Sequence, residues 1–275
     1  MKILVSNDDG IHARGIRVLA RRLAEDPGNE VYVVAPDRER SATGHSLTLN
    51  EPLRVGHVPM GENIAGAWAT TGTPSDCVKF AVCALLDGMP DLLVSGINAG
   101  PNLGGDVLYS GTVSAAMEGA LLSIPSIAMS MGERSPKYYE VAAEFASQLS
   151  KLMSTFHLPR RTLLNVNVPN LPSDEIAGVA ITELGVRLYN DTFEKRLDPR
   201  GKAYYWLTGH VVEEGEVEGS DVCALRKKQI SITPVTFNMT DRHSLTRLGQ
   251  WQELDTLSGS WQHLASSNVR AESSQ

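Results

Sequence analysis

Short runs of apolar residues recur along the chain as far as Val168, and they are rich in residues that favour strands. Most positions within a run are apolar, with little polar alternation. This pattern is typical of strands covered on both faces, as in a parallel sheet. It predicts buried strands at residues 3–5, 31–34, 92–94, 124–129 and 163–168.

Between these runs, apolar residues fall three or four positions apart, which predicts amphipathic helices. One helix is expected around Ile16–Leu23, and a second is expected to begin at Thr73-Pro74, with Thr73 as its N-cap. Two further helical faces lie at 116–121 and 141–149. Strands that alternate with helices in this way predict an α/β protein with a Rossmann-like, doubly wound, mainly parallel sheet.

The pattern changes after Leu184, where a polar stretch carries several large aromatic side chains. Asp198–Gly201 is a strong turn signal, so residues 185–219 are predicted to form a projecting β-hairpin arm. Isolated hairpins are marginal in water, so the arm is either covered by a partner subunit or packed on its own domain. The rest divides into a Rossmann-like core and a C-terminal extension with an amphipathic start, at residues 1–184 with 220–240, and 241–275.

Composition and charge narrow the class of protein. The chain has 275 residues, 42% of them hydrophobic and 21% charged, which is typical of a globular protein with a large core. Its formal net charge of −7 argues against gripping nucleic-acid polymers, which usually requires a basic face. Three cysteines without a C-x-x-C pair argue against a disulfide framework or structural zinc, and no apolar run is long enough for a membrane span. We therefore expect a reduced, cytoplasmic location with neither a membrane nor a nucleic-acid partner.

An acidic pair, Asp8 and Asp9, directly follows the first predicted strand. Open α/β sheets bind ligands at the carboxyl ends of their strands, so this loop has the position of a functional site. Two adjacent carboxylates repel each other unless a cation or a proton relieves the repulsion. A divalent-metal site is the favoured interpretation, although the residues from Asn7 to Gly10 are also ordinary turn chemistry.

Three further polar segments follow predicted strands or open a helix. In residues 35–45, Ser41 is a candidate oxygen ligand, and an ordinary solvated loop explains the segment equally well. In residues 95–102, the amide oxygen of Asn98 is a candidate ligand, although Asn and Gly also simply make turns. The Ser-Gly-Thr sequence at 110–112 opens a helix, and it is either a phosphate site formed by free N–H groups or a plain N-cap.

The candidate ligands are oxygens of Asp, Ser and Asn side chains, and no His or Cys is required. This set suits a hard cation such as Mg²⁺ or Mn²⁺ rather than zinc. A hard cation beside helix N-termini is typical of phosphoryl chemistry. Contacts with the substrate and its phosphate are assigned to Asn7, Gly44, Ser110, Gly111 and Thr112.

Five long and specific segments cover the first ~130 residues densely: Ile3–Ile11, Val33–Ser46, Thr71–Val78, Val94–Asn102 and Tyr109–Ala116. In these segments and their order, the chain resembles the SurE family of survival proteins, which are metal-dependent 5'/3'-nucleotidases. The resemblance implies one divalent cation per subunit, Mg²⁺ or Mn²⁺, bound by Asp8, Asp9, Ser41 and Asn98. It also implies a Rossmann-like core with a projecting hairpin, and a C-terminal segment exchanged between subunits of a homodimer or homotetramer.

Residues and resemblance together predict a phosphomonoesterase that hydrolyses nucleoside 5'- and 3'-monophosphates with metal-activated water. Asp8 and Asp9 are its expected catalytic residues. Some members of the family also act on short polyphosphate.

Three alternatives remain at this stage. A haloacid-dehalogenase-type phosphatase would use Asp8 as a covalent nucleophile, but its signature has a second Asp two positions on, where this chain has Gly10. A receiver-like signalling domain needs an acceptor Asp at the end of a central strand, where this chain has Ser95-Gly96. A nucleotide sensor would bind the same ligand without turnover.

Overall fold

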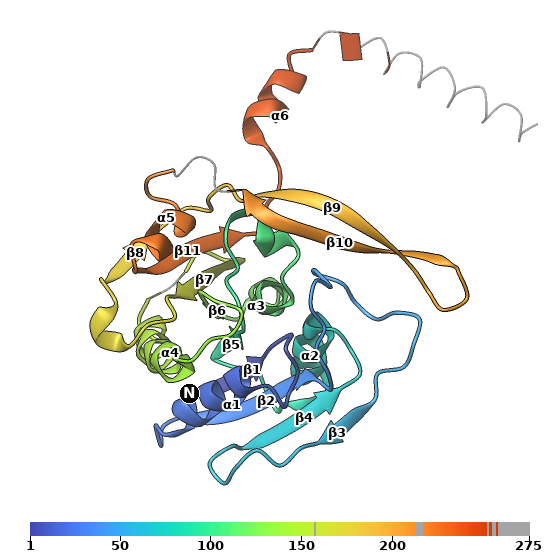
Figure 1. Ribbon diagram of the computed structural model, residues 1–275. Coiled ribbons are helices and arrows are strands. Elements are labelled where there is room, and N and C mark those ends of the chain that lie inside the picture. The colour runs from blue at the N-terminus through green and yellow to red at the C-terminus, as the bar shows by residue number, and fades with distance from the viewer. Residues whose placement is uncertain (157, 213–216, 252, 255–256, 258–275) are drawn as a thin grey trace, which may run out of the picture. The chain divides into compact units, whose positions relative to one another are not determined.

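The computed structural model describes residues 1–156, 158–212, 217–251, 253–254 and 257. In these residues a nine-stranded sheet has the strand order β3-β4-β2-β1-β5-β6-β7-β11-β8 (Figure 1). Six consecutive strands are parallel, namely β4 (Gly66–Thr70), β2 (Glu30–Pro36), β1 (Lys2–Ser6), β5 (Leu92–Asn98), β6 (Ser126–Met131) and β7 (Thr162–Val168). The edges are formed by β3 (Val55–His57), antiparallel to β4, and by β11 (Ile230–Thr236) and β8 (Val179–Ile181), of which β11 is antiparallel to β7.

Helices cover both faces of the sheet. On one face α1 (Arg14–Ala24) packs beside α4 (Tyr139–Met153), and on the other α2 (Pro74–Phe80) packs beside α3 (Gly111–Leu121) (Figure 1). Successive side chains of a strand point to opposite faces. Accordingly, Ile3 and Val5 of β1 join the core beneath α1 and α4, whereas Leu4 joins the core beneath α2 and α3. The predicted doubly wound, mainly parallel α/β fold is confirmed.

The start of α2 follows the predicted chemistry. Thr73 is the N-cap, and its hydroxyl accepts the backbone N–H of Asp76 at 3.1 Å, while the Asp76 carboxylate accepts the N–H of Thr73 at 2.9 Å. Pro74 occupies the first turn. This reciprocal capping satisfies two N–H groups that a helix start would otherwise leave unpaired.

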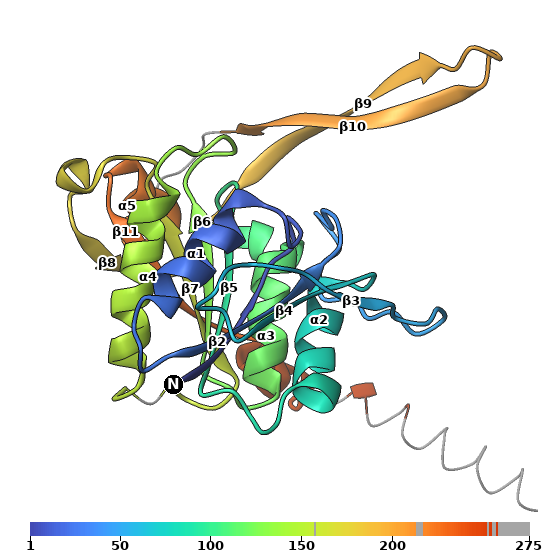
Figure 2. The same cartoon turned by 90° about the horizontal axis from the view of Figure 1, so that it is seen from below.

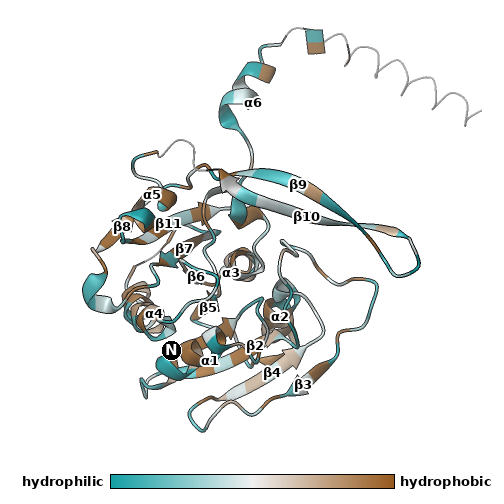
Figure 3. Cartoon of the chain, viewed as in Figure 1, coloured by the Kyte–Doolittle hydropathy of each residue, from teal (hydrophilic) through white to brown (hydrophobic). Residues whose placement is uncertain are grey.

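The aromatic stretch forms the predicted hairpin. β9 (Leu188–Leu197) and β10 (Ala203–Val212) pair antiparallel and extend away from the central sheet (Figure 2). The Asp198–Gly201 turn closes on itself, with the Gly201 N–H bonded to the Asp198 carbonyl at 2.9 Å. Hydrophobic and hydrophilic residues both occur along these strands (Figure 3), and Phe193 and Trp206 are 69% and 57% exposed.

The end of the chain is divided from the rest. The chain separates into two compact units, Met1–Phe237 and Asn238–Gln275. The first unit includes α5 (Asp221–Arg226), whose N-cap is Ser220, and ends after β11. The second unit contains α6 (Arg242–Leu248). The boundaries at 184, 219 and 240 stay a prediction, and residues 213–216 of the arm and 258–275 of the extension lie outside the described residues. Within the described part, no helix is both long and apolar enough to cross a membrane.

Some strands departed from the sequence pattern. β3, β4 and β8 were not predicted, because β4 (Gly-Ala-Trp-Ala-Thr) and the two three-residue strands lack a run of branched apolar residues. The run predicted at 124–129 becomes a strand only from Ser126, after Pro125. The antiparallel pairing of β11 with β7 could not be read from the pattern of residues in either strand.

Candidate active site

The acidic loop follows β1, the strand at which the order of the sheet reverses. β1 pairs with β2 on one side and with β5 on the other, and both pairs are parallel. The chain builds β2 and β4 first and then crosses β1 to build β5, β6 and β7 (Figure 1). The loops after β1, β2 and β5 therefore lie at one edge of the sheet, at its topological switch point.

Asp8 is buried and is held by the first turn of α3. It is 5% exposed, and one of its carboxylate oxygens accepts a hydrogen bond from the Thr112 hydroxyl. Gly111 permits this approach, because a Cβ at that position would lie 2.6 Å from the Cβ of Asp8. Gly111 and Thr112 were expected in a phosphate site, and they directly contact the predicted metal ligand.

Burial raises the pKa of both acidic side chains. Loss of hydration raises the pKa of Asp8 to about 6, opposed by the hydrogen bond from Thr112 and reinforced by the charge of Asp9. Burial also raises the pKa of Asp9, opposed by a hydrogen bond from Ala99 and reinforced by the charge of Glu39. Adjacent carboxyl groups that resist ionisation form the electrostatic setting in which a bound cation is strongly stabilising.

Asp9 connects the acidic loop with the loop after β5. Its Oδ2 accepts the backbone N–H of Ala99 at 3.0 Å, so Asn98 lies next to this contact. The side-chain amide of Asn98 donates through Nδ2 to the Gly100 carbonyl at 2.9 Å. With the nitrogen engaged in this way, Oδ1 is the atom of Asn98 that suits a cation. The structure therefore brings Asp9 and Asn98 together.

The loop after β2 reaches the acidic loop through its backbone. The N–H of Arg40 donates to the Asp8 carbonyl at 2.8 Å, and Ser41 is the next residue. The exposed Ser41 hydroxyl donates to the Glu39 carboxylate at 2.6 Å. Backbone contacts thus place Ser41 at the site. To act as a ligand, its hydroxyl would give up the hydrogen bond to Glu39 and bind the cation instead.

Two residues assigned to the phosphate use their polar groups within the protein. The Ser110 hydroxyl accepts the N–H of Val113 at 3.1 Å, which is an ordinary N-cap bond. Gly44 donates its N–H to the Tyr109 carbonyl at 3.2 Å, and its φ of +55° suits glycine. At the start of α3, phosphate contacts would therefore come from the backbone N–H groups of the first turn, supported by the helix dipole.

The donor set fits a hard divalent cation. Carboxylate and amide oxygens come from neighbouring strand ends, which is the ligand type that such cations prefer. Among the described residues no three His, Cys, Asp or Glu side chains gather, so Ser41 and Asn98 would have to complete the set. Asn7 donates through Nδ2 to the Gly10 carbonyl at 2.9 Å, while its Oδ1 is buried and has no partner in the described structure. An orphaned buried acceptor beside an acidic pair fits a site that a hydrated ligand completes.

A buried asparagine cluster that sequence reasoning missed supports the loop after β5. Asn102 donates its backbone N–H to Asn167 Oδ1 and its Nδ2 to Ser130 Oγ, both at 2.8 Å. Its carbonyl accepts from Nδ2 of Asn165 at 2.8 Å and of Asn167 at 3.0 Å. The cluster fixes the segment that carries Asn98 onto β6 and β7. The only signal was two asparagines inside an otherwise apolar strand.

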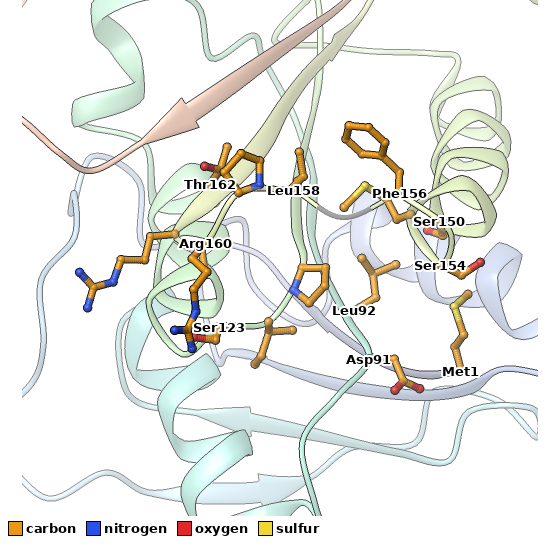
Figure 4. Close-up of a pocket in the computed structure, with 16 residues that line it drawn as sticks. Met1, Asp91, Leu92, Ser123, Ser150, Ser154, Phe156, Leu158, Arg160 and Thr162 are labelled. Atoms are coloured by element: carbon orange, nitrogen blue, oxygen red, sulfur yellow. The ribbon is translucent and has the colours of Figure 1, made fainter.

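A cavity of about 710 Å³ lies at the opposite edge of the sheet. Figure 4 shows Met1, Asp91 and Leu92 from the starts of β1 and β5 in its wall, together with Phe156 and Leu158 from the segment after α4. These residues lie at the amino ends of the strands, so this cavity is separate from the acidic loops.

A sheet whose switch point carries a buried carboxylate, Asp8, beside a half-buried one, Asp9, among oxygen-rich loops defines an α/β protein with an acidic candidate site. The sequence model of the family described as Survival protein SurE matches residues 3–191. The chain therefore belongs to the SurE family.

Relatives cover nearly the whole chain. A protein named 5'-nucleotidase SurE from Thermosynechococcus vestitus is 54% identical over 256 residues, which span 91% of this chain and 96% of that protein. A protein of the same name from Trichodesmium erythraeum is 52% identical over 262 residues, spanning 92% and 97%. The crystal structure of SurE from Aquifex aeolicus superposes with a TM-score of 0.78 at 38% identity, and the match covers 92% of this chain and 100% of that one.

Proposed function

We propose that this chain is a divalent-metal-dependent 5'-nucleotidase, which hydrolyses nucleoside 5'-monophosphates, and 3'-monophosphates as well, to nucleoside and phosphate. The observation that carries the proposal is the contact between the acidic pair and the start of α3. Asp8 is bonded to Thr112 there, and the proteins at 50–54% identity over most of the chain are named 5'-nucleotidase SurE. A cytoplasmic location accords with its three free cysteines.

In this proposal Asp8, Asp9, Ser41 and Asn98 hold one Mg²⁺ or Mn²⁺ ion per subunit. Such an ion supplies positive charge to a phosphoryl group and makes water more acidic. The first two ligands adjoin the elements expected to bind the phosphate, because Asp8 touches α3 and Asp9 touches the backbone after β5. The residues that would hold the cation and those that would bind the substrate's phosphate thus lie next to each other in the folded protein.

The chain's own groups have distinct tasks in hydrolysis. The N–H of Ser110 donates to the Asp106 carbonyl at 3.2 Å, so the N–H groups of Gly111 and Thr112 are the ones at the start of α3 that bind non-bridging phosphate oxygens as negative charge shifts among them. Thr112 keeps the Asp8 carboxylate in one orientation. Asp8 or Asp9 orients the attacking water and accepts its proton.

The test is phosphate release from a panel of nucleoside 5'- and 3'-monophosphates, measured with Mn²⁺, with Mg²⁺ and with EDTA. The proposal expects release with either metal and none with EDTA. Nucleotide binding without release under every metal would instead establish a nucleotide sensor.

Acid quenching during turnover of a phosphate-labelled substrate distinguishes direct attack by water from a route through a covalent phospho-enzyme. Attack by water leaves no label on the protein. Label on Asp8 would establish the haloacid-dehalogenase-type route and contradict the proposal.

A further inference from the structure

Glu118 is a buried carboxylate that the proposed chemistry does not use. It lies on α3, is 4% exposed and is bound by two donors from other segments. Lys79 Nζ of α2 lies 2.8 Å from its Oε1, and His45 Nε2 lies 2.8 Å from its Oε2. Burial acts to raise the pKa of Glu118, but the hydrogen bonds from His45 and Lys79 hold that pKa below its usual range. Glu118 is therefore an anion that joins two segments to α3.

His45 belongs to a long irregular segment whose conformation depends on contacts of this kind. Between the end of β2 at Pro36 and the start of β3 at Val55, the chain has no helix or strand. In the part around His45 apolar packing is weak, because Leu47 and Leu49 are 40% and 84% exposed. A loop without buried apolar contacts depends on polar tethers for its conformation.

The tethers enclose residues 40–46, which we term the Ser41 loop. At one end the Arg40 N–H binds the Asp8 carbonyl at 2.8 Å. At the other end Gly44 binds the segment just before α3, and His45 binds Glu118. Beyond His45, the Ser46 carbonyl accepts the Thr73 hydroxyl at 2.8 Å. Ser41 therefore lies between the tether to the acidic loop and the tether to α3.

The same helix holds both sides of the site. The first turn of α3 contacts Asp8 through Thr112, and Glu118, six residues further on, contacts the Ser41 loop. A rigid helix that touches both segments fixes their separation.

We propose that Glu118 is a positioning residue that, through His45, holds the Ser41 loop against α3 and so places Ser41 as a ligand of the cation. The inference rests on the proposed function for its meaning, but the fastening itself is testable without metal. Groups that orient metal ligands typically contribute tenfold or more to metal affinity.

The experiment compares His45→Ala, His45→Gln, Glu118→Gln and Lys79→Met with wild type. Glu144→Gln is the matched control, since it breaks an ion pair of similar geometry with Arg22, which lies 2.6 Å away on the opposite face of the sheet. Amide hydrogen exchange of residues 41–46 is measured in metal-free protein, and Mn²⁺ binding is measured by calorimetry. Thermal unfolding separates loss of the tether from loss of the fold.

His45→Ala is expected to speed exchange in the Ser41 loop and to weaken Mn²⁺ binding about tenfold, with a nearly unchanged thermal midpoint. Glu118→Gln keeps an acceptor for His45 but loses the charge, so its effects on exchange and binding are expected to have the same direction and to be smaller. His45→Gln, which keeps a donor, restores most of both properties. Lys79→Met and Glu144→Gln leave loop exchange and Mn²⁺ binding near wild type, because neither removes the bond to the loop.

The inference is overturned if His45→Ala exchanges and binds Mn²⁺ as wild type does, or if Lys79→Met weakens binding as much as His45→Ala. Failure of the proposed function looks different. In that case the wild-type protein binds no Mn²⁺, while the exchange rates still report whether His45 holds the loop.

Discussion

The acidic pair is stable in its position because a few neighbouring atoms fit closely around it. Gly111 lets α3 approach Asp8. The Thr112 hydroxyl donates a hydrogen bond to the Asp8 carboxylate, and the Ala99 N–H donates one to the Asp9 carboxylate. Adjacent aspartates after a strand could be recognised from sequence, since both their type and their position are local. The contact of Thr112 with Asp8 joins residues 104 positions apart, so no local pattern indicated it.

Gly111→Ala should damage the site, because its Cβ would fall 2.6 Å from the Cβ of Asp8 and the start of α3 must shift. We expect a loss of about 1–3 kcal/mol in the free energy of unfolding, as for overpacked sites, and at least a tenfold loss of phosphate release. Gly105→Ala is the control, since a Cβ there meets nothing within 4 Å. Thermal unfolding and phosphate release are measured together, and equal behaviour of the two variants would contradict the close fit.

Because the pKa of Asp8 is raised, the stability of the metal-free protein should change with pH in a definite direction. Its folded-state pKa of about 6 exceeds the ordinary aspartate pKa of 3.8, so its contribution to stability is present below pH 3.8 and is lost as pH rises through 6. Asp8→Asn, which cannot ionise, should therefore raise the thermal midpoint of metal-free protein at pH 7.5 by several degrees, and by much less near pH 4. If the thermal midpoint of Asp8→Asn at pH 7.5 is at or below that of wild type, then ionised Asp8 does not destabilise the metal-free protein and the prediction is wrong.

Among the elements, the long apolar runs and helical periodicities were predictable, whereas the supports of the loops were not. The parallel strands other than β4, and the helices α1 to α4, follow local pattern and capping, as at Thr73. β4 was not predicted, because alanine and glycine have little preference for strands. The asparagine cluster depends on Asn102 meeting Asn167, 65 positions away, so only the folded sheet reveals it.

Removing a member of that cluster should loosen the loop after β5. Asn167→Ala leaves the buried N–H of Asn102 without its acceptor, which costs about 1–3 kcal/mol in the free energy of unfolding. It should also weaken Mn²⁺ binding, because Asn98 lies on the same segment. Asn63→Ala, at an exposed position, is the matched control. Denaturant unfolding and calorimetry measure both effects, and a stability equal to that of the control would contradict this role.

At the scale of the whole molecule, the hairpin carries the strongest indication of assembly. Its root is fixed, because Asp106 accepts from Arg187 at 2.5 Å and from Tyr189 at 2.8 Å, while its far part extends from the sheet (Figure 2). Phe193 and Leu207 face each other across the strands and are 69% and 61% exposed. Exposed apolar side chains on a projecting arm favour a partner subunit, which accords with the homodimer or homotetramer expected from the sequence.

Replacing both Phe193 and Leu207 by serine should therefore lower the mass of the assembly. The substitution removes the paired apolar side chains and leaves the root of the arm intact. Leu152→Ser, at a residue of α4 that is 64% exposed, is the control and should leave the assembly unchanged. Light scattering after size exclusion gives the masses, and a monomeric wild-type protein would remove the proposed subunit contact altogether.

The most direct test of the central claim follows metal binding and phosphate release in the same sample. Mn²⁺ is titrated into metal-free wild type and Asp9→Asn while release from a nucleoside 5'-monophosphate is recorded. The account predicts that wild-type activity rises in step with one bound ion per subunit, and that Asp9→Asn loses both binding and release. Undiminished release with EDTA, or wild-type Mn²⁺ affinity in Asp9→Asn, would contradict it.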